Sequence, residues 1–517
     1  MSKNTILVAL WLLHVFVGAG YAEEVSDDEK SQPAKVKFSI VDAATGAFVP
    51  CRIHLTDDKG QPQLFDHVPS YRDHFCCDGD ETVALEPGRY SFVIERGPEY
   101  KRCRGSFEVR EAAQIEVQEK LTRMANMAAE GWWSGELHVH RPIKDIELLM
   151  KAEDLHVAPV ITWWNASNAW KGSKLPTRRV AKFDDNIFCD LLGGEDERAG
   201  GAYMFFNVSI PIDITWAASE YPSPLYFIEQ TLWQPDAWVD IEKPFWWDVP
   251  VVLAHGYGDS IGLANNHCWR SGMLDNEAWG KPRDRQDFPA PYGNGFWSQE
   301  IYYHILNSGI RIAPSAGSAS GVLPNPVGYN RVYVYLGTDK LDYRSWWENL
   351  HKGRCFVTNG PLLRPDVEGH KPGHVFTARK GQEIGLQIDL SLDSCDPIRC
   401  IEIVKNGIVE RTVSGDGFGK GGRLGTLHFD RSGWFLVRAI ADVPHTFRFA
   451  STAPYYVEIG ENKRYLSRRS IRFFLDWLDE RVQRIRIEDA KKHRQVLDYH
   501  RQARQFWQER LEVANAD

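Results

Sequence analysis

Alternating apolar and polar positions predict a β-rich segment in the first quarter of the chain. Residues 36–41, 52–55 and 90–94 are short apolar runs, and turn residues such as those at 86–88 separate them. A period of two, interrupted by turns, is typical of short strands in a small antiparallel sandwich. We therefore predict a β-sandwich over residues 36–121.

The largest block, residues 122–365, mixes helical and strand periods. Helical spacing begins at Asp145, which is placed to cap a helix, and continues to Leu155, before a buried apolar run at 157–162. Strand, helix and strand in this order predict a βαβ unit. The other expected strands cover 202–207, 249–254 and 331–336, and the other expected helices cover 298–308 and 344–351. The pattern predicts an α/β barrel of distorted TIM type with polar residues at its strand ends.

The last third of the chain changes character twice. Strand-like runs at 384–390, 401–404 and 433–438, with Asn406-Gly407 as a tight turn, predict a second, immunoglobulin-like sandwich over residues 366–460. Residues 461–517 carry an apolar helical stripe and predict a docked helical pair; a dimerisation arm that forms a homo-oligomer is the alternative. The fold class is therefore multidomain, α/β plus all-β.

The N-terminal residues predict that the protein is exported from the cytoplasm. Lys3 precedes an apolar run at 6–17, small residues follow at 18–22, and residues 23–35 are charged and polar. This order is typical of a cleavable signal peptide over residues 1–22, followed by a flexible leader over 23–35, and the alternative is an uncleaved anchor. We expect a secreted or periplasmic protein with no transmembrane span in the mature chain.

Charge and cysteine content narrow the function classes. The formal net charge is -9 and the charges are interspersed, which argues against a nucleic-acid partner. Nine cysteines suit an oxidising compartment, and we expect one disulfide in the early group and one between Cys395 and Cys400. The early group consists of Cys51, Cys76, Cys77 and Cys103.

The most informative chemistry is a His-x-His pair, His138 and His140, at the end of an apolar segment. Strand side chains alternate, so both imidazoles would lie on one face and bind one metal ion. Glu195 and His255, which follow other predicted strands, would complete a four-ligand site for zinc, iron or manganese. The alternatives are a surface histidine pair, a solvated Glu195 and a core histidine at 255.

In this order, the pieces resemble the PHP-like metallohydrolases of the carbaryl-hydrolase type, the CehA/McbA family. Members carry a Trp before Gly-Asp-Leu-His-x-His, then a strand ending in Asp-His-Asn, then Gly-x-Glu, a strand with His, and Gly-Ser-Asp-x-His. The matching positions are 133–140, Asn165, 193–195 and His255, and residues 353–361 are similar to the closing motif. The resemblance covers roughly residues 130–365 and implies a PHP-like barrel. Residues 36–121 also look like the transthyretin-like or carboxypeptidase-regulatory-like modules of secreted proteins.

The departures from the family reduce the implied ligand set. Trp163 and Trp164 stand where the family has Asp and His, Glu136 replaces an Asp, and residues 315–320 contain neither Asp nor His. The remaining residues fit one divalent ion, at most two.

The implied activity is hydrolysis of an ester or phosphoester in a small-molecule or glycan substrate. His255 would be a ligand or a proton shuttle and Asp145 would orient water, while Asn165, Trp163 and Trp164 would bind substrate, although burial in a core also explains tryptophans. The alternative is a non-catalytic glycan-binding or ligand-binding protein with a degenerate metal site.

Overall fold

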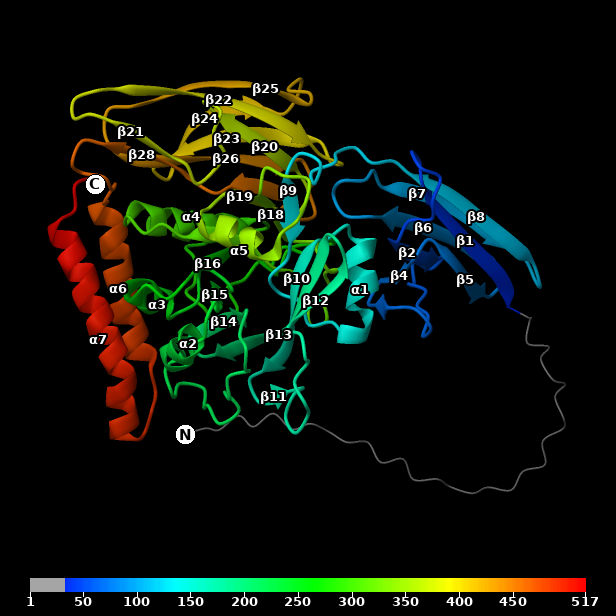
Figure 1. The fold of residues 1–517 in the computed structure, drawn as a ribbon, viewed down its shortest axis with the longest axis horizontal. Coiled ribbons are helices and arrows are strands. Elements are labelled where there is room, and N and C mark those ends of the chain that lie inside the picture. The colour runs from blue at the N-terminus through cyan, green and yellow to red at the C-terminus, as the bar shows by residue number, and fades with distance from the viewer. Residues whose placement is uncertain (1–32) are drawn as a thin grey trace.

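The computed structural model describes residues 33–517, so the predicted signal peptide and all but the end of the predicted leader lie outside the described residues. The described chain is a mixed α/β protein with several β-sheets and seven helices. In Figure 1 the N-terminal strands lie to one side of the central strands, the last strands lie above them, and two long C-terminal helices flank them.

Two sheets form the N-terminal layer. One has the order β5-β1-β8 and the other the order β3-β4-β2-β6-β7, and they enclose a core drawn from residues 34–121 alone. The strands are β1 (Ala34–Asp42), β2 (Cys51–Asp57), β3 (Ser70–Tyr71), β4 (His74–Cys77), β5 (Asp80–Leu85), β6 (Gly88–Glu95), β7 (Cys103–Val109) and β8 (Gln114–Leu121). Alternating burial along β5 and β6 is what the sequence pattern predicts for a sheet with one wet face.

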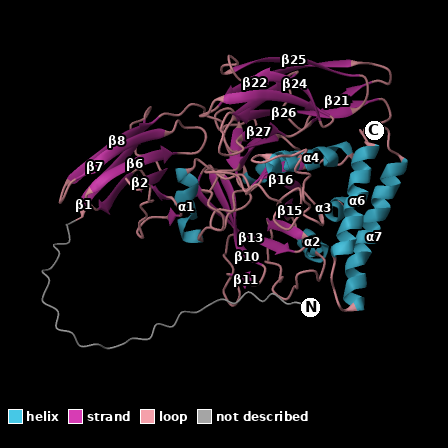
Figure 2. Ribbon diagram, turned by 180° about the vertical axis from the view of Figure 1, so that it is seen from behind, coloured by secondary structure: helices cyan, strands magenta, loops and turns pink. Residues whose placement is uncertain are grey.

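A closed sheet forms the centre of the molecule. Its strands are β9 (Trp132–Gly135), β10 (Val157–Trp164), β11 (Ser167–Asn168), β12 (Val180–Asp184), β13 (Ile187–Arg198), β14 (Gly201–Phe206), β15 (Trp238–Ile241), β16 (Ser260–Ala264), β17 (Ala313–Ala316), β18 (Arg331–Tyr335) and β19 (Cys355–Thr358). The helices are α1 (Ile143–Ala152), α2 (Pro224–Leu232), α3 (Val249–His255), α4 (Gly293–Asn307) and α5 (Tyr343–His351). Figure 2 shows α1 between the N-terminal and the central strands.

Strand directions in this sheet are mixed. The pairs β9–β10, β10–β13, β15–β16 and β16–β17 are parallel, whereas β14 is antiparallel to both of its neighbours, β13 and β15. It follows that β9, β10, β13, β15 and β16 run in the same direction, and their carboxyl ends meet at one end of the sheet.

The expected strand at 249–254 is wrong, because these residues form α3. Pro250 occupies the first turn, and Gly256 ends the helix in the left-handed conformation, with φ of 71°. Both residues are typical of helix boundaries, but the short apolar run between them is equally typical of a strand. Asp145 is not the cap of α1 either: Pro142 precedes the helix, and Asp145 lies in its first turn.

The last strands form a second β-rich layer, in which six strands continue the central sheet and the other three form a separate sheet. They are β20 (Leu362–Val367), β21 (Val375–Ala378), β22 (Ile384–Asp393), β23 (Ile398–Lys405), β24 (Ile408–Ser414), β25 (Gly421–Phe429), β26 (Gly433–Ala441), β27 (Phe449–Thr452) and β28 (Tyr455–Ile459). β19 pairs with β27, and β20 runs across the predicted division at residue 365. Asn406 and Gly407 both have positive φ between β23 and β24, which confirms the predicted hairpin turn.

Two helices, α6 (Arg468–Arg484) and α7 (Ala490–Glu512), end the fold and pack on the central layer. Trp477 and Trp507 are fully buried, and the Trp507 indole donates a 2.9 Å hydrogen bond to the carbonyl of Pro250. The apolar stripe is therefore covered within the chain, as a docked pair requires. Nowhere in residues 33–517 is a helix both long and apolar enough to cross a membrane.

The expected disulfides are absent. All nine cysteines, which lie within the described residues, are free. Cys51 and Cys77 face each other across paired strands with their Sγ atoms 3.9 Å apart, while Cys395 points to the carbonyl of Tyr100 instead of Cys400.

Candidate metal centre

The two histidines of the His-x-His pair lie just beyond β9, in an extended segment that is hydrogen-bonded on both sides. The Val139 carbonyl accepts from Ile161 in β10, and His140 N–H donates to the carbonyl of Ser320. Side-chain alternation then buries Val139 in a small core and sends both imidazoles to the opposite side. Gly317 allows the neighbouring chain to approach, because a Cβ there would lie 2.4 Å from the His138 Cβ.

Both imidazoles converge on Glu195 of β13. The Nε2 atoms of His138 and His140 lie 3.0 Å apart, and Glu195 Oε2 lies 3.7 Å from the first and 3.2 Å from the second. Ligands bound tetrahedrally at about 2.0–2.1 Å lie about 3.3 Å from one another, so the three atoms have the spacing of ligands around one ion. Of the predicted ligands, these three are brought together.

The electrostatics suit a cation. Glu195 Oε2 is buried and has no hydrogen-bond partner, and burial raises the pKa of this carboxyl to about 7. Burial lowers the pKa of His140 to about 4, so its imidazole is neutral at pH 7 and can offer a lone pair. An unpartnered buried carboxylate oxygen beside two imidazole nitrogens is costly alone, and a divalent ion would satisfy all three.

Glu242, which follows β15, supports the pair from behind. Its Oε1 lies 3.3 Å from His138 Nδ1, while its Oε2 accepts from Lys243 and, at 2.9 Å, from the Trp246 indole. Burial alone would raise the pKa of Glu242, but Lys243 and His138 lower it to about 2. Glu242 Oε1 is buried and makes no hydrogen bond, so the carboxylate faces His138 Nδ1 as a nearby negative charge.

Other polar side chains come from the same end of the sheet. Glu197 of β13 accepts a 3.0 Å hydrogen bond from the Trp164 indole, and burial and Glu195 raise the pKa of Glu197 to about 7. His267, after β16, donates from Nδ1 to the Asn276 carbonyl at 2.9 Å, and burial and Lys243 lower its pKa to about 3. Sequence reasoning missed Glu242 and Lys243, although a Glu-Lys pair directly after the mainly apolar segment Trp-Val-Asp-Ile at 238–241 was an available signal.

The predicted substrate residues divide into two groups. Trp164 lies beside the histidines, with its ring centroid 4.9 Å from that of His140. Trp163 points the other way into the core, where it stacks on Phe205 and its indole donates to the Leu192 carbonyl, so its expected substrate role is wrong. Asn165 has φ of 49°, and its side chain accepts a 2.8 Å hydrogen bond from the Glu197 backbone, which makes it a turn residue.

His255 and Asp145 are not part of the cluster. His255 ends α3, where its Nε2 lies 3.2 Å from the Tyr499 carbonyl and its ring contacts Tyr499 and Tyr257, so its expected roles as ligand and proton shuttle are corrected. The cause is the helix that replaces the expected strand. In the described residues no hydrogen bond or ion pair joins the Asp145 carboxylate to either histidine of the pair, and α1 instead packs against the N-terminal strands.

Glu136 stands where the family that the sequence resembles has Asp, and its side chain hydrogen-bonds backbone groups inside the protein. Its carboxylate accepts backbone N–H bonds from Ser318, at 2.5 Å, and from Gly328, and burial raises its pKa to about 8. The side chain thereby fixes the segment that carries the His140 hydrogen bond.

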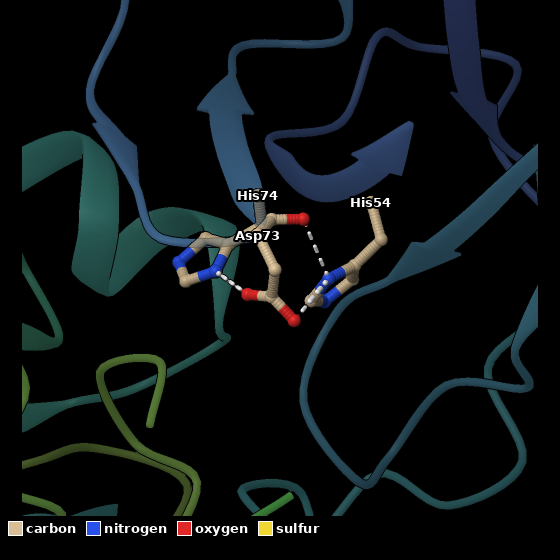
Figure 3. Close-up of side chains that lie close together, drawn as sticks. All are labelled: His54, Asp73 and His74. Carbon is tan, nitrogen blue, oxygen red and sulfur yellow. Dashed lines mark hydrogen bonds and ion pairs between the residues drawn. The ribbon is translucent and has the colours of Figure 1, made fainter. Parts of the chain in front are cut away.

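A second group, His54, Asp73 and His74, also gathers potential ligands (Figure 3). However, Arg52 Nε donates to His54 Nε2 at 3.0 Å, which places the His54 proton on Nδ1, and Nδ1 faces the Asp73 carbonyl at 3.1 Å. Both His54 nitrogens are therefore engaged, and Arg52 adds positive charge. This arrangement is a hydrogen-bonded support between strands and not a cation site.

No family model matches this chain, and no curated protein matches it. Among solved structures, a similarity is found to the Bacillus anthracis TIE protein, at 16% identity over 22% of this chain and 20% of that one, with a TM-score of 0.15. The matched region is thus one fifth of that protein's length, and a TM-score this low does not indicate a shared fold.

Proposed function

We propose that this protein is a secreted or periplasmic metal-dependent hydrolase of the PHP-like class that cleaves an ester or phosphoester. The observation that carries the proposal is the convergence of His138 Nε2, His140 Nε2 and the unpartnered Glu195 Oε2 within 3.7 Å of one another. Two imidazoles and a carboxylate are a donor set typical of catalytic zinc and also suit manganese or iron.

A divalent ion in this position would lower the pKa of a bound water and polarise an ester or phosphoryl oxygen. Three protein ligands leave a coordination position open for water or substrate. The Glu242 carboxylate faces His138 Nδ1, and the half-buried Trp164 lies beside the His140 ring. Glu197, held by Trp164 and with a pKa near 7, is placed to exchange a proton at neutral pH.

Metal analysis tests the proposal directly. We expect about one tightly held divalent ion per chain in the purified protein and none in a His138→Ala/His140→Ala variant. The matched control is His255→Ala, which removes a histidine outside the cluster and is expected to retain the metal. Elemental analysis after dialysis provides the measurement. Absence of metal in the unmodified protein, even after reconstitution, would overturn the hydrolase proposal and favour a non-catalytic glycan-binding protein.

The support from Glu242 gives a second expected result. Glu242→Gln removes the negative charge that faces His138 Nδ1, so we expect the affinity for the divalent ion to fall by about 10–100-fold. Competition with a metal-binding dye would measure this change. Asp240→Asn, two residues earlier in the chain, is the control, because Asp240 accepts from Ser260 and Ser315 and touches neither histidine. Equal affinities in all three proteins would show that Glu242 does not act on the ligand.

A further inference from the structure

A cluster of five arginines, three of them buried and two partly exposed, lies where the N-terminal sandwich, the central sheet and the last strands meet. Its five members line one cavity of about 40 Å³. They are Arg52, Arg102, Arg270, Arg331 and Arg448. Arg52 belongs to β2, Arg331 to β18, and Arg448 directly precedes β27, so all three layers contribute. The cavity shares no lining residue with the His138–His140–Glu195 cluster.

The carboxylates in this region do not balance the arginines. Glu95 pairs with Arg52, Arg102 and Arg270, Glu153 pairs with Arg52 and Arg331, and Asp396 pairs with Arg102 and Arg448. Five guanidinium groups thus face three carboxylates, which leaves two positive charges in excess. Even if the half-exposed Asp73 is counted, at 4.0 Å from Arg270, one positive charge remains. Buried charge without a counter-charge is costly.

Two of these arginines also carry buried N–H groups without an acceptor. Arg331 Nη2 and Arg448 Nε make no hydrogen bond, although the two residues are only 1% and 5% exposed. The Arg331 Nη2 atom lies 3.6 Å from the nearer oxygen of Glu153, which is too far for a hydrogen bond, and Arg448 engages Asp396 through Nη1 instead. Both unsatisfied donors belong to residues that line the cavity.

We propose that this cavity binds one small oxoanion of the phosphate or sulfate class and that the bound anion ties the three layers together. The cavity has room for a few water-sized groups, since one water needs about 10–15 Å³ by the same measure. An oxoanion would neutralise the excess charge and accept from the free Arg331 and Arg448 donors, and the planar guanidinium fork suits oxoanion geometry. Water molecules would accept from the free Arg331 and Arg448 donors, but they would not neutralise the excess positive charge.

The test uses purified, metal-depleted protein, so that phosphate cannot bind at the His138–His140–Glu195 cluster. Ion chromatography after denaturation measures anions that co-purify, and thermal unfolding is followed against phosphate or sulfate at an ionic strength held constant with chloride. We expect either about one co-purified oxoanion per chain or a melting temperature that rises by a few degrees with oxoanion concentration. A protein without a co-purified oxoanion whose melting temperature responds equally to chloride would overturn the proposal.

A pair of variants separates the cavity from general salt effects. Arg448→Gln removes one donor set and one charge, and we expect at least about 10-fold weaker phosphate binding. Arg344→Gln is the control, because this arginine is exposed and lies outside the cluster, and its response should match that of the unmodified protein. If Arg448→Gln does not fold, Arg448→Lys, which keeps the charge but loses the Nε donor, should still show weakened binding. Unweakened binding in the folded Arg448 variant would refute the assignment.

Discussion

Replacing Glu195 by glutamine is expected to lower the affinity for a divalent ion by at least about 100-fold and to abolish any hydrolase activity that depends on that ion. The substitution preserves the volume of the side chain but removes the one carboxylate among residues 33–517 that meets both His138 Nε2 and His140 Nε2. Isothermal titration of the metal-free protein with zinc or manganese measures the change.

Glu197→Gln is the matched control for this experiment. Glu197 lies two residues along the same strand and on the same face, yet its carboxylate bonds the Trp164 indole and neither histidine. We expect its metal affinity to stay within about 10-fold of the unmodified protein, because it supports the site only indirectly. If the two variants lost affinity equally, the position of the ion relative to β13 would have to be reassigned.

Replacing Arg481 by methionine is expected to destabilise the docking of the two C-terminal helices by about 3–5 kcal/mol. The substitution leaves the buried Asp248 carboxylate and the partly buried Glu220 carboxylate without their guanidinium partner. Arg481 of α6 is 3% exposed and bonds Asp248, at 2.6 Å, and Glu220 through both Nη atoms. Asp248 also lies 3.5 Å from His500 of α7, so one buried carboxylate connects both helices to the central layer. Amide hydrogen exchange in α6 and α7 should become at least about 100-fold faster.

Arg484→Met controls for loss of an arginine from the same helix. Arg484 is half-exposed and pairs with Glu480 one turn away, an arrangement that contributes about 0.3–0.5 kcal/mol. Its effect on exchange should therefore be about 2-fold. A slow, unchanged exchange in Arg481→Met would mean that apolar burial alone holds the helices.

The local sequence pattern correctly predicted those parts of the fold that depend on residues close together in the sequence. Alternation placed the N-terminal strands and both imidazoles of the His-x-His pair, and the Asn406-Gly407 dipeptide specified its hairpin. Local pattern failed at 249–254, because six apolar residues suit a buried strand and a short helix equally well. That single ambiguity misplaced His255.

Contacts between distant segments could not be predicted in the same way. Glu136 accepts a hydrogen bond from the backbone N–H of Gly328, which is 192 residues away in the sequence. The sequence around a single glutamate does not indicate whether its carboxylate bonds backbone N–H groups or a metal ion. The arginine cluster likewise draws members from segments as far apart as Arg52 and Arg448. Such arrangements arise from the topology of the sheets, which periodicity alone does not determine.

The segment that carries the two histidines also has a consequence for the order of folding. Residues 137 and 140 are hydrogen-bonded to Ala316 and Ser320, so the ligand geometry depends on closing a loop of nearly the whole central block. Contacts that close a long loop form late in folding, because the chain loses the entropy of the loop before the new contacts stabilise it. A nascent chain released before residue 316 would contain all three ligands and yet lack half of the framework that aligns them, so a cation would bind only the completed protein.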